Sequence, residues 1–230
     1  SGFSDFAGST LVHACGGAAA LAGVIVLGAR EGRFNKKGET KSLVPFAASS
    51  IPLVTLGTFL LWFGWFGFNG FSQLAMGTFD DVNAISKIAV NTHLAGAAGT
   101  VAAAVVTRLL GGKTDIVMML NGALAGLVAI TAEPLTPSPV LAIAIGAIGS
   151  LIMYFGTKFL ESKKIDDVVG AIPVHMFAGI FGTLVVPLSN SGTNFGTQLT
   201  GVIAVCVFSF VLSYICLLYT SDAADDSFGV

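Results

Sequence analysis

The side chains best suited to chemistry in this chain lie in two copies of one short motif. Residues 5–13 read DFAGSTLVH and residues 167–175 read DVVGAIPVH, so both follow the pattern D-x2-G-x3-V-H. His13 and His175 therefore occupy equivalent positions, each inside a hydrophobic segment. A neutral imidazole offers one donor and one acceptor nitrogen. Two such rings can hydrogen-bond a polar substrate and relay its proton.

The aspartates that open the two motif copies are Asp5 and Asp167. Each stands at the entrance of the segment that carries its histidine. A carboxylate at the start of a helix accepts hydrogen bonds from free backbone N–H groups and faces the positive end of the helix dipole. We expect both aspartates to cap helix starts.

The composition predicts an all-α polytopic membrane protein. Of the 230 residues, 54% are hydrophobic and 10% are charged, whereas soluble domains carry about 25% charged residues. Apolar runs recur that are long enough to cross a hydrocarbon core of about 30 Å. The net charge of −2 points to no partner, and no basic patch suggests nucleic acid. We expect seven membrane-spanning segments, at about 8–29, 44–67, 84–110, 115–132, 138–160, 168–187 and 196–218.

The basic residues predict the orientation of these segments. Loops 30–43, 108–114 and 158–167 hold all of the Lys and Arg residues except Lys87. These loops follow the first, third and fifth segments, so they share one side of the membrane. By the positive-inside rule that side is cytoplasmic.

This orientation makes the two motif copies antiparallel, because the first segment enters from outside and the sixth from the cytoplasm. Equal spacing from opposite faces brings both histidines toward the membrane centre. Inverted repeats of this kind place a transport site between two halves. Five segments run from the second to the sixth, but one precedes them, so we expect about four further helices upstream of residue 1.

The second segment ends in the aromatic run LLWFGWFGFNGFSQL. Most of these rings fit a belt at the membrane interface. Alternatively, one ring lines a pore mouth beside the polar residues Asn69 and Ser72.

Three stretches, DFAGSTLVH, WFGWFGFN and IDDVVGAIPVHMFAGIFGTL, resemble the ammonium transporter (Amt/Rh) family on its Amt side. The similarity extends to about residue 214. It implies a fold of eleven helices in two inverted five-helix halves plus a last helix, with one pore per subunit of a homotrimer. This chain would supply about the fifth to the eleventh helices, with the four N-terminal helices missing.

The resemblance also implies roles for individual residues along the pore. These are His13 and His175 as the twin histidines, Phe68 as a gate, Asp5 and Ser72 as the vestibule that recruits ammonium, and Asp167 as the structural acidic equivalent of Asp5.

The implied function is passage of ammonium or ammonia through a hydrophobic pore. A charge at the bilayer centre costs about 3 kcal/mol on insertion scales, so a pore that removes the proton and passes neutral ammonia avoids that cost. The implied setting is the cell membrane, with a PII-type regulatory protein as a possible cytoplasmic partner. We expect no cofactor, no metal and no enzymatic activity.

Two other functions remain open from the sequence. An ammonium sensor of the same family would share every motif above. A membrane metalloenzyme using His13, Cys15 and His175 is disfavoured, because Cys15 lies two residues from His13 and points to another helix face. Zinc also requires at least three protein ligands.

The chain divides into a membrane domain, 1–215, and a tail, 216–230. Residues 216–226 resemble a translated sequencing-adapter segment, and we expect this tail to be non-native. Its acidic residues are therefore assigned no function.

Overall fold

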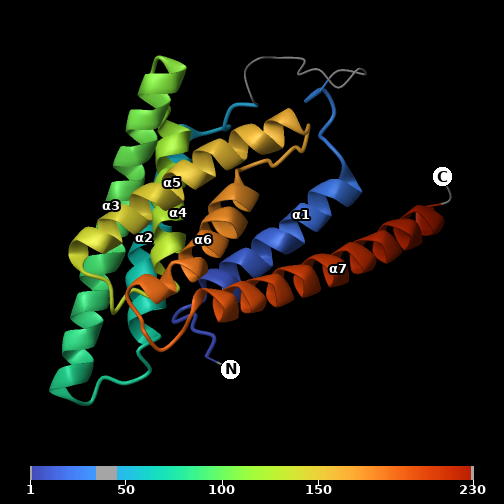
Figure 1. Ribbon diagram of the computed structural model, residues 1–230. Helices are drawn as coiled ribbons and strands as arrows, with labels where there is room; N and C mark the ends of the chain where they lie inside the picture. The colour runs from blue at the N-terminus through green and yellow to red at the C-terminus, as the bar shows by residue number, and fades with distance from the viewer. Residues whose placement is uncertain (1, 35–45, 229–230) are drawn as a thin grey trace.

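The computed structural model describes residues 2–34 and 46–228, and it contains helices and no strand in those residues. Figure 1 shows a bundle of packed helices, with η marking π- and 3-10-helical pieces. The helical elements are η1 (Ser9–Ala14), α1 (Cys15–Leu27), α2 (Ile51–Phe71), α3 (Phe79–Gly111), α4 (Ile116–Ile130), α5 (Pro139–Ser162), η2 (Ile172–Phe177), α6 (Ala178–Leu184), η3 (Val186–Leu188) and α7 (Phe195–Phe228). The predicted all-helical fold is confirmed.

Each predicted membrane segment corresponds to one helical stretch. Five of the stretches are long and apolar enough to cross a membrane, and the two shorter ones are α4 and the stretch Ile172–Leu188. Two helix starts were predicted wrongly by five residues or more, both because a cap decides where the helix starts, and α7 ends at Phe228 rather than at 218. Ser50 accepts a hydrogen bond from the amide of Leu53, so α2 begins at Ile51 rather than 44. A capping box between Thr78 and Asp81 starts α3 at Phe79 rather than 84.

Small residues let α3, α4 and α5 approach one another closely. A Cβ added to Gly99 would meet the carbonyl of Gly122, and one added to Gly146 would meet the carbonyl of Ala95. Backbone cannot move aside as a side chain can, so these glycines set the spacing between the helices. Such small-residue contacts are the usual basis of helix association in membranes.

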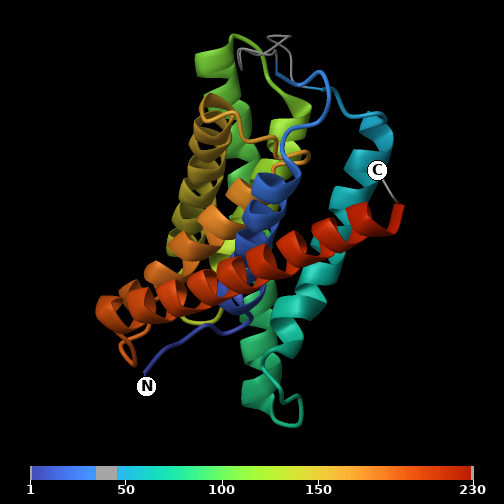
Figure 2. The same cartoon turned by 90° about the vertical axis from the view of Figure 1, so that its right-hand side faces the viewer.

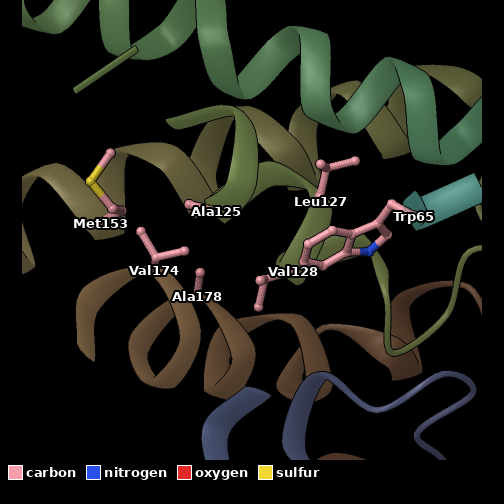
Figure 3. Close-up of a cluster of buried hydrophobic side chains, with 7 residues drawn as sticks. All are labelled: Trp65, Ala125, Leu127, Val128, Met153, Val174 and Ala178. Carbon is pink, nitrogen blue, oxygen red and sulfur yellow. The ribbon is translucent and has the colours of Figure 1, made fainter. Parts of the chain in front are cut away.

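A buried apolar cluster joins this three-helix unit to the motif-bearing helices. Figure 3 shows its members, which come from α2, α4, α5, η2 and α6. They are Trp65, Ala125, Leu127, Val128, Met153, Val174 and Ala178. The cluster brings the residue before His175 into contact with the same core that holds the indole of α2.

The two motif-bearing helices cross as an antiparallel pair, as predicted. The Thr10 hydroxyl donates to the Thr183 hydroxyl at 2.7 Å, while Gly17 lies against Met176. As the residue number rises along the His13 helix, the number of its contact on the His175 helix falls, so the two helices are antiparallel. Helix α7 packs along α1 on the outside of this pair (Figures 1 and 2).

The segments after α1, α3 and α5 lie at one end of the bundle (Figure 1). A cavity of about 120 Å³ opens there, and it is lined by Arg30, by Val117 at the start of α4 and by Asp167 before η2. The described parts of the three basic loops thus share one end, whereas residues 35–45 of the first loop lie outside the described residues.

Candidate functional site

Both motif copies start their helices in the same way. The Asp5 carboxylate accepts hydrogen bonds from the amides of Thr10 and Leu11 at 2.9 and 2.8 Å. Asp167 accepts three, from the amides of Gly170, Ala171 and Ile172, at 3.1, 2.9 and 2.7 Å. Both carboxylates therefore bind free N–H groups at a helix start, as expected.

The glycine in each motif copy has a specific conformational reason. Gly8 has φ of 105° and Gly170 has φ of 81°, a region that residues with a Cβ rarely adopt. The left-handed residue turns the chain so that the carboxylate three residues earlier reaches the first amides. The D-x2-G spacing is thus a helix-start device.

The histidines lie on π-helical turns, η1 and η2, which continue into α1 and α6. In η1 the amide of His13 bonds the carbonyl of Gly8 at 3.1 Å, five residues back. π-helical turns inside α-helices occur frequently at functional sites. Nothing in the motif letters predicted this wider turn.

The two imidazoles face each other at the crossing point. The Nδ1 atoms of His13 and His175 are 3.2 Å apart, their ring centroids are 5.2 Å apart and their planes are inclined by 16°. One Nδ1 must donate and the other accept, so the shared hydrogen bond couples the two tautomers. The Nε2 atom of His13 is buried with no hydrogen-bond partner in the described residues, which leaves it available.

Two rings of α2 lie against His13. Trp65 stacks on the imidazole with centroids 5.0 Å apart, and Phe68 lies 5.6 Å from the same ring. The Trp65 indole donates to the hydroxyl of Thr131 at 2.9 Å, which fixes the indole plane. From the sequence, Trp65 was one ring of the aromatic run and was not singled out as a pore residue. Its spacing of three residues from Phe68, which puts both on one helix face, was the available signal.

The remaining predicted residues lie at the ends of the helices that carry the site. Ser72 ends α2, and its hydroxyl donates to the Phe68 carbonyl at 2.9 Å. Asp5 is separated from His13 by the first turns of its helix, and burial raises the pKa of the Asp5 carboxyl against the lowering effect of its amide donors. Asp167 lies at the opposite end of the crossing, beside the cavity of the basic loops.

The chain is similar to known proteins along most of its length. The family description "Ammonium Transporter Family" matches residues 1–224. The chain belongs to the ammonium transporter family. It is 44% identical over 192 residues to ammonium transporter Amt2 of Archaeoglobus fulgidus, covering 84% of this chain and 40% of that protein. A putative ammonium transporter of Synechocystis sp. is 41% identical over 225 residues, covering 96% of this chain and 50% of that protein.

Solved structures agree with the family assignment. A protein titled "Sensor Amt Protein" aligns with a TM-score of 0.87 and 36% identity, over 96% of this chain and 55% of that one. Candida albicans Mep2 aligns with a TM-score of 0.82 and 30% identity, over 94% and 50%. The chain therefore spans about half the length of the family members it matches.

Two glycines at the crossing, Gly17 and Gly179, extend the repeat of this chain. Gly17 and Gly179 each lie four residues after a motif histidine. A Cβ on Gly17 would lie 2.6 Å from the Cβ and the amide nitrogen of Met176, and a Cβ on Gly179 would meet the carbonyl of Ser9. The full repeat is therefore D-x2-G-x3-V-H-x3-G. The identical spacing in both copies was the signal that would have revealed these two residues.

Within residues 2–34 and 46–220, no three His, Cys, Asp or Glu side chains are grouped so that they could hold a metal ion. Cys15, the third ligand of the metalloenzyme alternative, belongs to no such group. The chemistry available at the crossing is hydrogen bonding and proton transfer by imidazole.

Proposed function

We propose that this chain forms the pore-lining part of a transporter that moves ammonium or ammonia across the cell membrane. The observation that carries the proposal is the hydrogen-bonded pair of histidines, held at 3.2 Å by two antiparallel helices. Packing alone gives no reason for an identical helix start before each of two facing imidazoles. The relatives' names, which describe ammonium transporters, support the same substrate.

The proposed mechanism follows from the cost of a charge in the membrane, about 3 kcal/mol at the bilayer centre on insertion scales. Ammonium gives one proton to an imidazole nitrogen and continues as neutral ammonia, whose lone pair was freed by that transfer. Through the Nδ1–Nδ1 hydrogen bond His13 passes its Nδ1 proton to His175, which then releases its own Nε2 proton toward the inner side. His13 Nε2 is the available contact for the substrate.

Asp5, Ser72 and Phe68 are proposed to act at the outer mouth. Phe68 is 40% exposed and lies against His13, so the ring covers the entrance to the imidazole pair and would act as a gate. A cation held against an aromatic face gains about 0.5–2 kcal/mol, depending on desolvation. The Ser72 oxygen and the buried Asp5 carboxylate add hydrogen-bond acceptors there. Asp167 holds the start of η2 at the inner end.

The basic end of the bundle is proposed to face the cytoplasm, where a PII-type protein could dock. A homotrimer is proposed as the assembly. The exposed apolar groove between α3 and α5, about 670 Å³ in volume, is a surface that another subunit could cover. Residues 1–215 would form the membrane domain, and we retain the proposal that 216–230 is non-native.

The decisive experiment replaces the histidines one at a time, in the complete gene that encodes this sequence. His13→Ala and His175→Ala are each expected to abolish ammonium-induced current in a transporter-deficient cell. His93→Ala is the matched control, because His93 contacts Trp62 and Phe66 on α2 and takes no part in the pair. Normal currents in both pair variants would disprove the relay.

Ammonium sensing is the second candidate, favoured by the structural similarity to a protein titled a sensor. Methylammonium uptake by the wild-type protein separates the two functions. Uptake above that of empty cells supports transport, whereas binding without uptake supports sensing.

A further inference from the structure

The residue before each motif aspartate is hydrogen-bonded by a side chain from another part of the chain. That side chain follows, in the sequence, the helix that carries the other histidine. Before Asp167 stands Asp166, and before Asp5 stands Ser4. Asp166 is bound by Arg30, which follows α1, the helix of His13. Ser4 is bound by Gln198 of α7, which follows the helix of His175. We call these contacts the inner clamp and the outer clamp.

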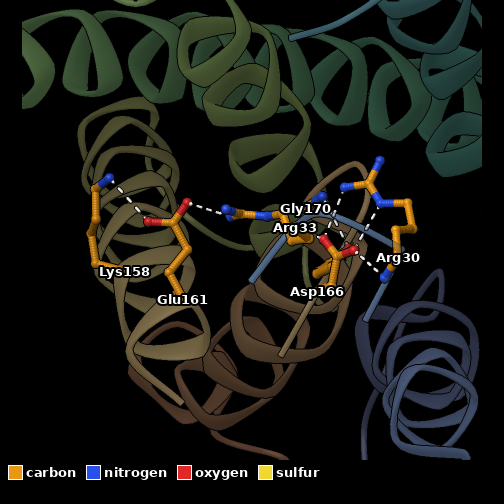
Figure 4. Close-up of polar contacts among 7 residues, drawn as sticks. Arg30, Arg33, Lys158, Glu161, Asp166 and Gly170 are labelled. Carbon is orange, nitrogen blue, oxygen red and sulfur yellow. Dashed lines mark hydrogen bonds and ion pairs between the residues drawn. The ribbon is translucent and has the colours of Figure 1, made fainter. Parts of the chain in front are cut away.

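The inner clamp is a multiply bonded ion pair between the buried carboxylate of Asp166 and the exposed side chain of Arg30 (Figure 4). Arg30 Nε and Nη2 lie 2.7 and 2.8 Å from the two carboxylate oxygens of Asp166, and the Arg30 amide donates to the same group at 3.0 Å. Arg33 adds a third cationic contact at 3.4 Å. The Asp166 side chain is 2% exposed. Forked arginine–carboxylate pairs restrict both direction and distance, so this contact fixes where the α1 end meets the η2 start.

The inner clamp sits beside the segment that positions His175. Asp166 is directly followed by Asp167, whose carboxylate binds the first three amides leading into η2. Any displacement of Asp166 is therefore passed to the start of η2. His175 lies in that same short element.

The outer clamp is neutral, with a half-buried Ser4 and a buried Gln198. Gln198 Oε1 accepts from the Ser4 amide at 2.9 Å, and its Nε2 donates to the carbonyls of Ser4 and Thr183 at 2.6 and 2.9 Å. Thr183 belongs to α6, so one side chain ties the start of the His13 segment to the end of the His175 helix. Gln198 has no exposed surface.

Two clamps are needed because a helix crossing by itself can pivot. The glycine contacts set how closely the helices approach at the crossing, but they leave rotation about that point free. A tie at each end removes this freedom. The distance between the imidazoles tolerates little change, because a hydrogen bond at 3.2 Å is already at the long end of the usual range.

We propose that the inner and outer clamps are positioning elements that keep His175 in register with His13, with the Arg30–Asp166 pair setting the inner half. The proposal rests on the proposed transport function. It assigns Arg30 and Asp166 to turnover rather than to substrate capture, since this pair lies at the opposite end of the crossing from the outer mouth formed by Asp5, Phe68 and Ser72.

The test uses Asp166→Asn, which keeps the size of the side chain and removes its charge. Because displacement of about 1 Å at a reacting centre can cost about 100-fold, the maximal rate of methylammonium uptake is expected to fall at least about tenfold. The KM is expected to stay within about twofold, since capture occurs at the other mouth. Asp166→Glu, which restores the charge, should recover part of the rate.

Lys158→Gln is the matched control. It breaks the neighbouring Lys158–Glu161 pair, whose lysine side chain is 51% exposed, and exposed pairs contribute about 0–1 kcal/mol. Both uptake parameters should stay at the wild-type values. If Asp166→Asn does not reach the membrane, Arg30→Lys replaces it, because lysine keeps the charge but cannot form the fork.

A second measurement does not depend on transport. A high-resolution structure of the Asp166→Asn protein is expected to show the two Nδ1 atoms beyond hydrogen-bonding distance. An unchanged maximal rate, or an unchanged separation of these atoms, would overturn the clamp proposal. Absence of uptake by the wild-type protein would overturn the transport function instead, and the structural comparison would still decide on the clamp.

Discussion

Gly17→Ala should disable transport by separating the two imidazoles. The added Cβ would lie 2.6 Å from the Cβ and the amide nitrogen of Met176, the residue directly after His175. Non-bonded carbons prefer separations of about 3.5–4.0 Å, so the helices must part by about 1 Å. The Nδ1 atoms of the pair, now 3.2 Å apart, would then be about 4 Å apart, outside hydrogen-bonding range.

The size of the effect follows from this displacement. Inserting a methyl group into a packed contact costs about 1–3 kcal/mol, which most folded proteins survive. A shift of about 1 Å at reacting groups can cost about 100-fold in rate. We therefore expect Gly17→Ala to reach the membrane at reduced levels and to take up methylammonium at about a hundredth of the wild-type rate per molecule.

Gly16→Ala provides the control within the same helix. Gly16 is exposed, and a Cβ there meets nothing within 4 Å. Alanine is favoured over glycine inside a helix by about 0.5–1 kcal/mol, so this variant should transport normally and be slightly more stable. The assay is uptake of labelled methylammonium, divided by the amount of protein in the membrane. Equal uptake by the Gly17 and Gly16 variants would refute the reasoning.

Two further predictions concern the stability of the elements around the site. Trp65→Phe removes the indole N–H that bonds the buried Thr131 hydroxyl and should lower the free energy of unfolding by about 1–3 kcal/mol; an unchanged melting temperature in detergent would contradict this. The side-chain hydrogen bond from Arg30 holds the pKa of the Asp166 carboxyl below its ordinary range. The stabilisation by the inner clamp is therefore complete above about pH 5 and is lost as the pH falls below about 4. The difference in melting temperature between wild type and Asp166→Asn should stay constant from pH 5 to 8 and shrink at lower pH.

The sequence determined the membrane architecture because it depends on patterns along the chain. The lengths of the apolar runs predicted the seven helical stretches. The basic residues predicted that the loops after the first, third and fifth stretches lie on one side. The D-x2-G spacing predicted carboxylate-capped helix starts at Asp5 and Asp167, which the hydrogen bonds confirm. Two helix starts were missed because the caps at Ser50 and Thr78 lie outside the hydrophobic pattern.

The tertiary structure decided what the repeated histidines face. Only the fold shows that the two Nδ1 atoms meet at 3.2 Å, that Trp65 stacks on His13, and that Gly17 permits the crossing. These contacts join residues far apart in the sequence, and their distances depend on how closely whole helices pack. The amino-acid order thus fixed which side chains enter each helix and from which end. The packing of small residues and the ties at both ends decided how closely those side chains meet.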